Sequence, residues 1–240
     1  MFAELRWQDT APILGKRDPL NILDLGNGRL RPQYTLLKSA GHKVCGIDLV
    51  NCPEPSVINS LYRIAQYLYT RNLAVPRRSL SNQTLVCGDV AQLPFRPGSF
   101  DLVTSVAAFE HFLDVPAVVE ELKRILRVGG LVWVCIHLYT CPSGAHNVTF
   151  TQIPLVKMPH GTDVWDHLRR RKLPYDVPLN EWRRDDYLEA FSEHFEILKQ
   201  YCAIREGVNF LTPELATELS TYDTDELTCH AYVIVARKTS

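Results

Sequence analysis

The hydrophobic residues of the first 136 positions alternate between two kinds of spacing. Short segments that are apolar almost throughout predict five strands, at 21–25, 43–48, 84–87, 100–106 and 131–136. Apolar residues at helical spacing predict helices between these strands, at 32–40, 56–73 and 115–126. Apolar strands that alternate with helices are typical of a parallel sheet covered on both faces. The pattern therefore predicts an α/β fold for this half of the chain.

The second half of the chain has a different pattern. Residues 137–180 contain five prolines and no long periodic segment, which is too much chain for a plain connection. After this insert we expect helices at 183–194 and 213–220 and strands at 195–204 and 230–237. At the other end, 1–20 should be a short lead-in, because Pro12, Gly15 and Pro19 interrupt any long element.

Composition and charge narrow the class of protein. With 240 residues and 46% hydrophobic positions, the chain can bury one substantial core. Lys and Arg total 26 against 27 Asp and Glu, so the net charge of -1 provides no general attraction to nucleic acid or anionic membranes. The most basic stretch, within 160–186, holds six basic and six acidic residues, which favours a self-compensated surface.

The seven cysteines are scattered and include no Cys-x-x-Cys pair, and no signal peptide precedes them. Several lie in apolar segments, where cysteine behaves as a small hydrophobic residue. We therefore expect reduced, buried thiols in a cytoplasmic protein. No apolar segment approaches the length of a membrane span, so no membrane partner is expected.

Acidic and glycine residues gather at the predicted strand ends. Asp24, Gly26 and Gly28 close the first strand, Asp48 ends the second, and Asp89 follows the third. Glycine allows a tight strand-to-helix turn and close approach of a ligand, although a Gly-x-Gly turn alone is a weak signal. A dinucleotide-binding dehydrogenase also combines such a turn with an acid, but it expects small residues at 26, 28 and 31. Position 31 is Arg, which disfavours that alternative.

Taken together, four ordered segments resemble the class I S-adenosylmethionine-dependent methyltransferases. They are Leu-Asp-Leu-Gly-Asn-Gly at 23–28, Gly-His-Lys-Val-Cys-Gly-Ile-Asp at 41–48, Gly-Asp-Val-Ala-Gln-Leu-Pro-Phe at 88–95 with 98–103 and Glu-His-Phe at 110–112, and Arg-Ile-Leu-Arg-Val-Gly-Gly at 124–130. The likeness covers about 21–136. The family's third glycine is replaced here by Leu30, and Asn27 stands where a smaller residue is common.

The resemblance implies a Rossmann-like, doubly wound, seven-stranded and mostly parallel sheet with an antiparallel last strand. It implies one methyltransferase domain over 1–240, with a cofactor-binding half at 21–136 and an acceptor cap inserted after strand five, at about 137–182. The implied cofactor is S-adenosylmethionine. Its expected binding residues are Asp24, Gly26, Asn27 and Gly28 for the methionine end, Asp48 and Leu49 for the ribose, Gly88, Asp89 and Val90 for the adenine, and Ser105 and Val106 beside the methionine.

Two histidines are candidate catalytic bases. His111 follows strand four and His137 ends strand five, at the edge where open sheets bind ligands. Histidine suits this role because its pKa lies near neutrality, and a base is needed if the acceptor is a hydroxyl or a protonated amine. Capping of the next helix is an equally good explanation for His111. No metal site is expected, because no group has metal-ligand spacing; His160 and His167 with two acids come nearest.

The expected reaction is transfer of a methyl group to a hydroxyl, and less so to an amine, of a small metabolite such as a sugar or natural-product intermediate. A nucleic-acid methyltransferase is the first alternative, but 105–108 lack an Asn/Asp-Pro-Pro-Tyr-type motif. The second is a cofactor-binding partner subunit without catalysis, against which the three acids argue. We expect a small-molecule acceptor and no nucleic-acid partner, and the sequence leaves a homodimer open.

Overall fold

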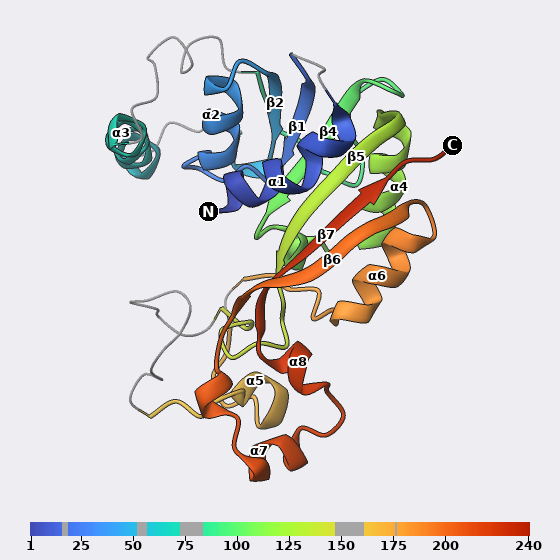
Figure 1. Ribbon diagram of the computed structural model, residues 1–240. Helices are drawn as coiled ribbons and strands as arrows, with labels where there is room; N and C mark the ends of the chain where they lie inside the picture. Colours follow the sequence, from blue (N-terminus) through green and yellow to red (C-terminus); the bar gives the residue numbers. More distant parts are fainter. Residues whose placement is uncertain (16–18, 52–56, 73–83, 147–160, 176) are drawn as a thin grey trace.

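The computed structural model describes residues 1–15, 19–51, 57–72, 84–146, 161–175 and 177–240 (Figure 1). Among these residues, no helix combines the length and the apolar character that a membrane-spanning segment needs. His160, named above in the nearest approach to a metal site, lies outside the described residues.

The described strands form one seven-stranded sheet in the order β3-β2-β1-β4-β5-β7-β6. Their bounds are β1 Asn21–Leu25, β2 Lys43–Ile47, β3 Leu85–Val86, β4 Phe100–Val106, β5 Leu126–His137, β6 Glu196–Arg205 and β7 Cys229–Arg237. The pairs from β3 to β5 are parallel, and β7 runs antiparallel to both β5 and β6. The predicted Rossmann-like, mostly parallel sheet with an antiparallel last strand is therefore confirmed.

Four helices cover the two faces of this sheet: α1 Phe2–Leu14, α2 Pro32–Ser39, α4 Val115–Ile125 and α6 Arg184–Ser192. Helix α3 Val57–Asn72 stands apart from the sheet (Figure 1). Successive side chains of a strand point to opposite faces, and Ile22 and Leu23 accordingly belong to different cores. Ile22 packs with Leu37 of α2, whereas Leu23 shares a core with Leu122 of α4. Burial on both sides explains why the strand segments are apolar throughout.

Helix α1 contradicts the expectation that residues 1–20 hold no long element. It spans Phe2–Leu14 even though Pro12 lies in its last turn. Tertiary contacts hold it on the sheet, because the buried Asp9 carboxylate accepts hydrogen bonds from Trp133 Nε1 at 3.0 Å and the Tyr201 hydroxyl at 2.7 Å. Packing of this kind overrides local propensity, including the loss of one helical hydrogen bond at Pro12.

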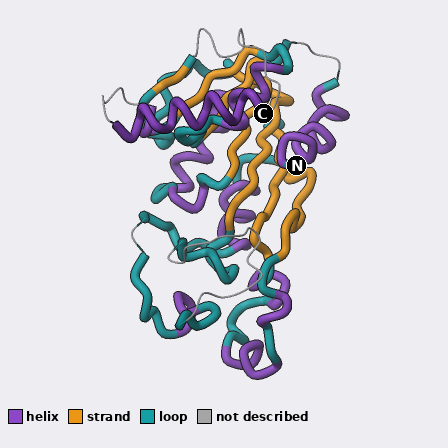
Figure 2. Tube along the Cα trace, turned by 90° about the vertical axis from the view of Figure 1, so that its left-hand side faces the viewer, coloured by secondary structure: helices purple, strands orange, loops and turns teal. Residues whose placement is uncertain are grey.

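A lower unit lies beyond the carboxyl end of β5 (Figures 1 and 2). It contains the insert after β5 with α5 (Asp166–Arg169), and also α7 (Pro213–Glu218) and α8 (Thr224–Leu227) from the β6–β7 connection. Trp165 of the insert packs with Leu219 and Leu227 of that connection. The sequence pattern predicted the helix at 213–220 but placed the cap in the insert alone, because the core that joins the two segments is formed by residues distant in the sequence.

Two local predictions were wrong. Helix α4 ends at Ile125 and β5 already begins at Leu126, because Leu126 pairs with Phe100 across an irregular register; the glycines at 129–130 lie within the strand. Five described cysteines are free, but the exposed Cys87 is disulfide-bonded, so the expectation of reduced, buried thiols fails there. Cys87 follows the edge strand β3, where no neighbouring strand covers it.

Candidate active site

Two adjoining cavities lie along the carboxyl edge of β1, β2 and β4. The first, of about 380 Å³, is lined by Asp24, Gly26, Asn27, Gly28, Arg29, Leu30, Pro32, Gln33, Tyr62, Val106 and Ala107. The second, of about 540 Å³, is lined by Gly26, Gly28, Asp48, Leu49, Gly88, Asp89, Val90, Ala91, Ala107, Ala108, His111, Phe112, Leu113, Asp114, Val118 and Pro178. Their shared wall is formed by Gly26, Gly28 and Ala107. Carboxyl edges of this kind are where open α/β sheets bind ligands.

The two glycines of this wall have backbone conformations that side chains disfavour. Gly26 has φ +67° and Gly28 has φ +62°. A Cβ added at Gly26 would collide with the side chain of Ala108, whereas one added at Gly28 would meet nothing within 4 Å. Gly26 is therefore required by packing as well as by φ, and Gly28 borders open space where a ligand can approach the backbone.

Asp24 ends β1 in an unusual electrostatic environment. It is 2% exposed, and its Oδ2 accepts no hydrogen bond from the described residues. Burial raises the pKa of Asp24 to about 7, against the opposing effect of the Arg6 guanidinium. Arg6 is fully buried in α1, and its Nη1 donates to Gln33 Oε1 at 2.6 Å. A buried acceptor without a donor fits an ammonium group in the first cavity.

Asp48 and Asp89 lie on the second cavity, as predicted from the sequence. The Asp48 carboxylate accepts from the backbone N–H of Gly28 at 2.8 Å and of Val50 at 3.0 Å. It thereby ties the glycine turn to the end of β2. Asp89 is exposed, and its Oδ1 accepts from the Ala91 N–H at 2.9 Å. Since a carboxylate has about four acceptor positions, both acids keep capacity for the hydroxyl or amino groups of a ligand.

Asn27 lines the first cavity but its side chain is engaged in the fold. Its amide exchanges hydrogen bonds with the side chain of Asn51 and donates to Gly28 O at 2.9 Å. A Cβ on Gly46 of β2 would lie 2.8 Å from Asn27 Oδ1. The larger residue at 27 is therefore accommodated by a glycine on the neighbouring strand.

The two residues predicted at the end of β4 differ in position. Val106 lines the first cavity. Ser105 is buried, lines neither cavity, and donates its hydroxyl hydrogen bond to Leu25 O at 2.9 Å. Its observed contact joins β4 to β1.

Four histidine rings lie in a row beside the second cavity. The ring centroids are 5.0 Å apart for His111 and His146, 4.6 Å for His146 and His137, and 4.2 Å for His137 and His230. His111 lies in the 3₁₀ turn η3 (Phe109–His111), while His137 and His230 come from β5 and β7. The row brings together both predicted bases, and His111 alone of the four lines a cavity described above.

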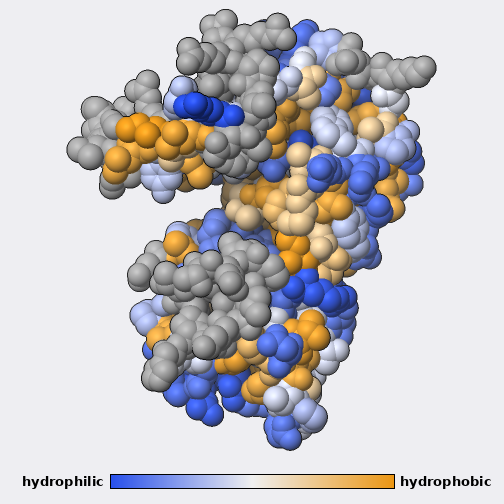
Figure 3. Space-filling model, turned by 60° about the vertical axis from the view of Figure 1, so that its left-hand side comes forward, coloured by the Kyte–Doolittle hydropathy of each residue, from blue (hydrophilic) through white to orange (hydrophobic). Residues whose placement is uncertain are grey.

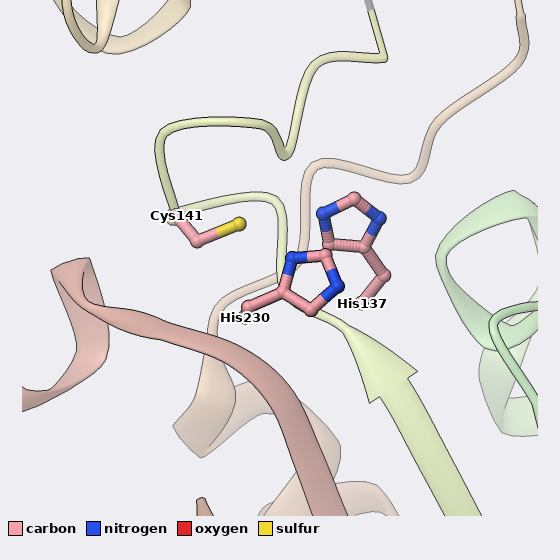
Figure 4. Close-up of side chains that lie close together, drawn as sticks. All are labelled: His137, Cys141 and His230. Atoms are coloured by element: carbon pink, nitrogen blue, oxygen red, sulfur yellow. The ribbon is translucent and has the colours of Figure 1, made fainter. Parts of the chain in front are cut away.

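A serine hydroxyl connects the inner end of this row. Ser143 Oγ lies 2.8 Å from His137 Nε2, 3.2 Å from His230 Nδ1 and 3.5 Å from Cys141 Sγ. Figure 4 shows His137, Cys141 and His230 directed towards one another. No pattern in the sequence predicts that Ser143 and His230 meet here, because 87 positions separate them.

Burial keeps the middle imidazoles of the row uncharged. Burial and the neighbouring histidines lower the pKa of His137 well below its ordinary value. The same two causes lower the pKa of His146 to about 4. Loss of hydration disfavours the charged form of an imidazole. At neutral pH both rings are therefore proton acceptors.

The return arm of the insert docks on η3. Asn180 Nδ2 donates to Phe109 O at 2.8 Å and Phe112 O at 3.0 Å. His111 Nδ1 lies 2.8 Å from Pro178 O, and since a carbonyl only accepts, Nδ1 carries the proton and Nε2 is left with a lone pair. This orientation of His111 could not be predicted, because it depends on a contact across 67 positions.

Described basic residues of the insert are paired with acids of the lower unit. They form four described ion pairs: Arg169–Glu218, Arg170–Asp163, Arg171–Glu181 and Lys172–Asp163. His167 lies 2.8 Å from Tyr139 O, and Trp165 Nε1 donates to Thr140 O at 3.0 Å, so these residues serve the core of the lower unit. Figure 3 shows a hollow with hydrophobic surface on its floor between the lower unit and the rest of the molecule.

The chain is similar to known methyltransferases. A family model for a methyltransferase domain matches residues 23–134. The chain is 32% identical over 150 residues to demethylmenaquinone methyltransferase of Thermus thermophilus, covering 62% of this chain and 61% of that protein. It is 27% identical over 143 residues to sterol 24-C-methyltransferase ERG6A of Gibberella zeae, covering 59% of this chain and 34% of that protein. The chain thus spans less than two thirds of either relative's length.

The fold comparison covers nearly the whole chain. The crystal structure of an S-adenosylmethionine-dependent methyltransferase from Mesorhizobium loti superimposes with a TM-score of 0.56 at 21% identity, covering 98% of this chain and 96% of that one. At this identity the likeness shows the fold. Residues 23–134 of this chain therefore match the model of a methyltransferase domain, and the chain has the fold of an S-adenosylmethionine-dependent methyltransferase.

Proposed function

We propose that this protein transfers a methyl group from S-adenosylmethionine to a hydroxyl oxygen of a small molecule. The observation that carries the proposal is the continuity of the two cavities with His111. Asp24, a buried acid whose Oδ2 has no donor among the described residues, faces one end, and His111 borders the other. S-adenosylmethionine supplies an already activated methyl group. The protein's task is to hold the acceptor in line with it and to exclude water.

Seven of the eleven predicted cofactor residues have a role in this proposal. Asp24 would accept from the ammonium of the methionine end, and the bare backbone at Gly28 lets that end approach closely. Asp48 would accept from ribose hydroxyls, and Asp89 from the adenine amino group. Val90 and Leu49 supply apolar walls for the base. The turn containing Gly26 keeps these groups at one edge of the sheet.

Oxygen is favoured as the acceptor because the site is rich in uncharged imidazoles. A hydroxyl must lose its proton as it attacks, and His111 Nε2 is positioned to take it. His137 lies second from His111 in the row and would receive the proton through His146 or act as an alternative base. In this proposal the predicted acceptor cap of a single domain is extended from the insert to the β6–β7 connection. A cytoplasmic location and a homodimer stay predictions.

A carbon acceptor is the second candidate function. It is favoured by one observation, the name of the sterol 24-C-methyltransferase to which the chain is similar. A small acceptor is preferred to nucleic acid in either case, because the basic residues of the insert are already paired with acids.

The test is product analysis with deuterated-methyl S-adenosylmethionine. The protein would be incubated with separate sets of hydroxylated sugars, phenols and prenylated quinols, and the label located by mass spectrometry and NMR. Label on oxygen that is lost in His111→Ala supports the proposal. Label on carbon selects the second candidate, and binding of the cofactor without turnover on any set contradicts catalysis on these acceptors.

A further inference from the structure

Glu110 is a buried acid whose carboxylate has no hydrogen-bonding partner. Its side chain in η3 is 1% exposed, and neither carboxylate oxygen accepts a hydrogen bond of good geometry from the described residues. Backbone amides of Glu110 and His137 lie near this carboxylate. Buried charge without compensation is costly, so this carboxylate requires a proton or a cation.

Two histidines complete a set of ligands around this carboxylate. His146 Nε2 is also buried and has no hydrogen-bonding partner among the described residues. Ligand atoms of Glu110, His111 and His146 all lie within 4.8 Å of one another. Three unused or available lone pairs therefore converge on one place, although 36 positions separate Glu110 from His146 in the sequence.

The third residue is held as metal-binding histidines usually are. A histidine ligand commonly donates its second ring N–H to a backbone carbonyl, which fixes the ring and its tautomer. His111 does this with Pro178 O at 2.8 Å, and its Nε2 remains for a ligand. The return arm of the insert thus prepares one coordination position.

We propose that Glu110, His111 and His146 bind one divalent transition-metal ion of the zinc type. The ion's remaining coordination position would be directed to the second cavity, which His111 lines. Its role rests on the proposed function and changes the part of His111 there, because Nε2 would hold the metal instead of taking the proton. The ion would hold the acceptor oxygen as a Lewis acid, and the released proton would pass to water in the second cavity. A set of two imidazoles and one carboxylate is typical of catalytic rather than structural zinc sites.

Closure of the site requires a small movement. Zinc–ligand bonds of roughly 2.1 Å at tetrahedral angles place ligand atoms about 3.4 Å apart. The three atoms must therefore approach by up to about 1.4 Å from their 4.8 Å limit, which side-chain rotation can provide. Imidazole and carboxylate donors favour zinc, cobalt or iron over calcium or magnesium, which prefer oxygen ligands alone.

The neighbouring group of His137, Cys141 and His230 is a weaker candidate. It also has its ligand atoms within 4.8 Å of one another (Figure 4). However, Ser143 Oγ lies 2.8 Å from His137 Nε2, 3.5 Å from Cys141 Sγ and 3.2 Å from His230 Nδ1. His230 Nδ1 is also 3.1 Å from Glu206 Oε2. The polar atoms of this group are thus already paired, which makes it the natural control.

The test is zinc binding to the full chain, measured by equilibrium dialysis after removal of metal with a chelator. We expect one zinc ion per chain, with affinity lowered by more than about 100-fold in Glu110→Gln and in His146→Gln, a loss larger than removal of an outer-shell partner produces. Cys141→Ser, in the neighbouring group, should retain the affinity. Circular dichroism and thermal melts establish that each variant is folded.

Cobalt substitution provides a second measurement. The visible spectrum of the cobalt-loaded chain should lack thiolate-to-metal charge transfer, because no cysteine belongs to the proposed ligand set. Absence of stoichiometric zinc binding, or loss of binding in Cys141→Ser with retention in Glu110→Gln, overturns the inference.

The inference and the proposed function fail separately. The metal-free chain and Glu110→Gln should both bind S-adenosylhomocysteine with the affinity of the zinc-loaded, unaltered chain. Full turnover by the metal-free chain would refute the catalytic role of the ion and leave methyl transfer standing. Zinc bound at these residues without turnover on any acceptor would support the metal site and contradict the proposed methyl transfer.

Discussion

The raised pKa of Asp24 makes a quantitative prediction about cofactor binding. Without a ligand, Asp24 holds its proton up to about pH 7 because it is buried. The ammonium of the methionine end should bind the ionised carboxylate, so binding below pH 7 releases this proton. The affinity should therefore rise about tenfold for each pH unit between pH 5 and 7, or about 100-fold in total, which corresponds to about 2.7 kcal/mol.

The assay is calorimetric titration with S-adenosylhomocysteine from pH 5 to 7.5, in buffers with different ionisation enthalpies. The apparent enthalpy should depend on the buffer below pH 7, which reports the released proton. Asp24→Asn is the matched control: it keeps the shape and has no proton to release, so its weaker affinity should be flat with pH. An equally flat profile in the unaltered chain would refute the electrostatic role of Asp24.

Three further predictions follow from contacts described above. Gly26→Ala should lower the free energy of unfolding, measured by urea titration, by about 2–4 kcal/mol, because it adds a collision with Ala108 to the cost of φ +67°. Gly98→Ala is the control: Gly98 has φ +66° and an added Cβ would meet nothing within 4 Å, so its loss should be only about 1–2 kcal/mol. Asp48→Ala leaves the N–H groups of Gly28 and Val50 without their acceptor and should weaken cofactor binding by about 1–3 kcal/mol, and a calorimetric value equal to the unaltered chain's would exclude Asp48 from the site. His111→Ala should reduce single-turnover rates by about 100-fold with little change in cofactor affinity, and unchanged rates in both His111→Ala and His137→Ala would leave positioning as the sole source of catalysis.

The stability of the chain should also depend on Asp24. Its folded-state pKa lies above the ordinary value of 3.8, so its contribution to stability is fully present below pH 4 and is lost as pH rises to about 7. The free energy of unfolding of Asp24→Asn should lack this loss, whose size is on the order of 4 kcal/mol. Urea titrations of both chains at pH 4.5 and 8 measure it as a difference of differences. The charge of Arg6 does not change across this range and cancels.

The sequence predicted those parts of the fold and site that are encoded by neighbouring residues. The strands and glycine turn depend on local periodicity and on φ, Asp24 lies near the end of β1, and Asp48 directly follows β2. Features that depend on distant partners could not be predicted. Asp9 holds α1 through residues more than 120 positions away, and His230 joins the histidine row only because β7 returns beside β5.

The proposed acceptor cap has a consequence for how acceptor choice would be encoded. Its core joins Trp165, from the insert after β5, to Leu219 and Leu227, from the connection between β6 and β7. Two stretches of the gene separated by a sheet strand and a helix therefore have to change together when the pocket above the donor is remodelled. Exchange of either stretch alone between related enzymes would give a mismatched core, so a chimera that alters substrate preference must carry both.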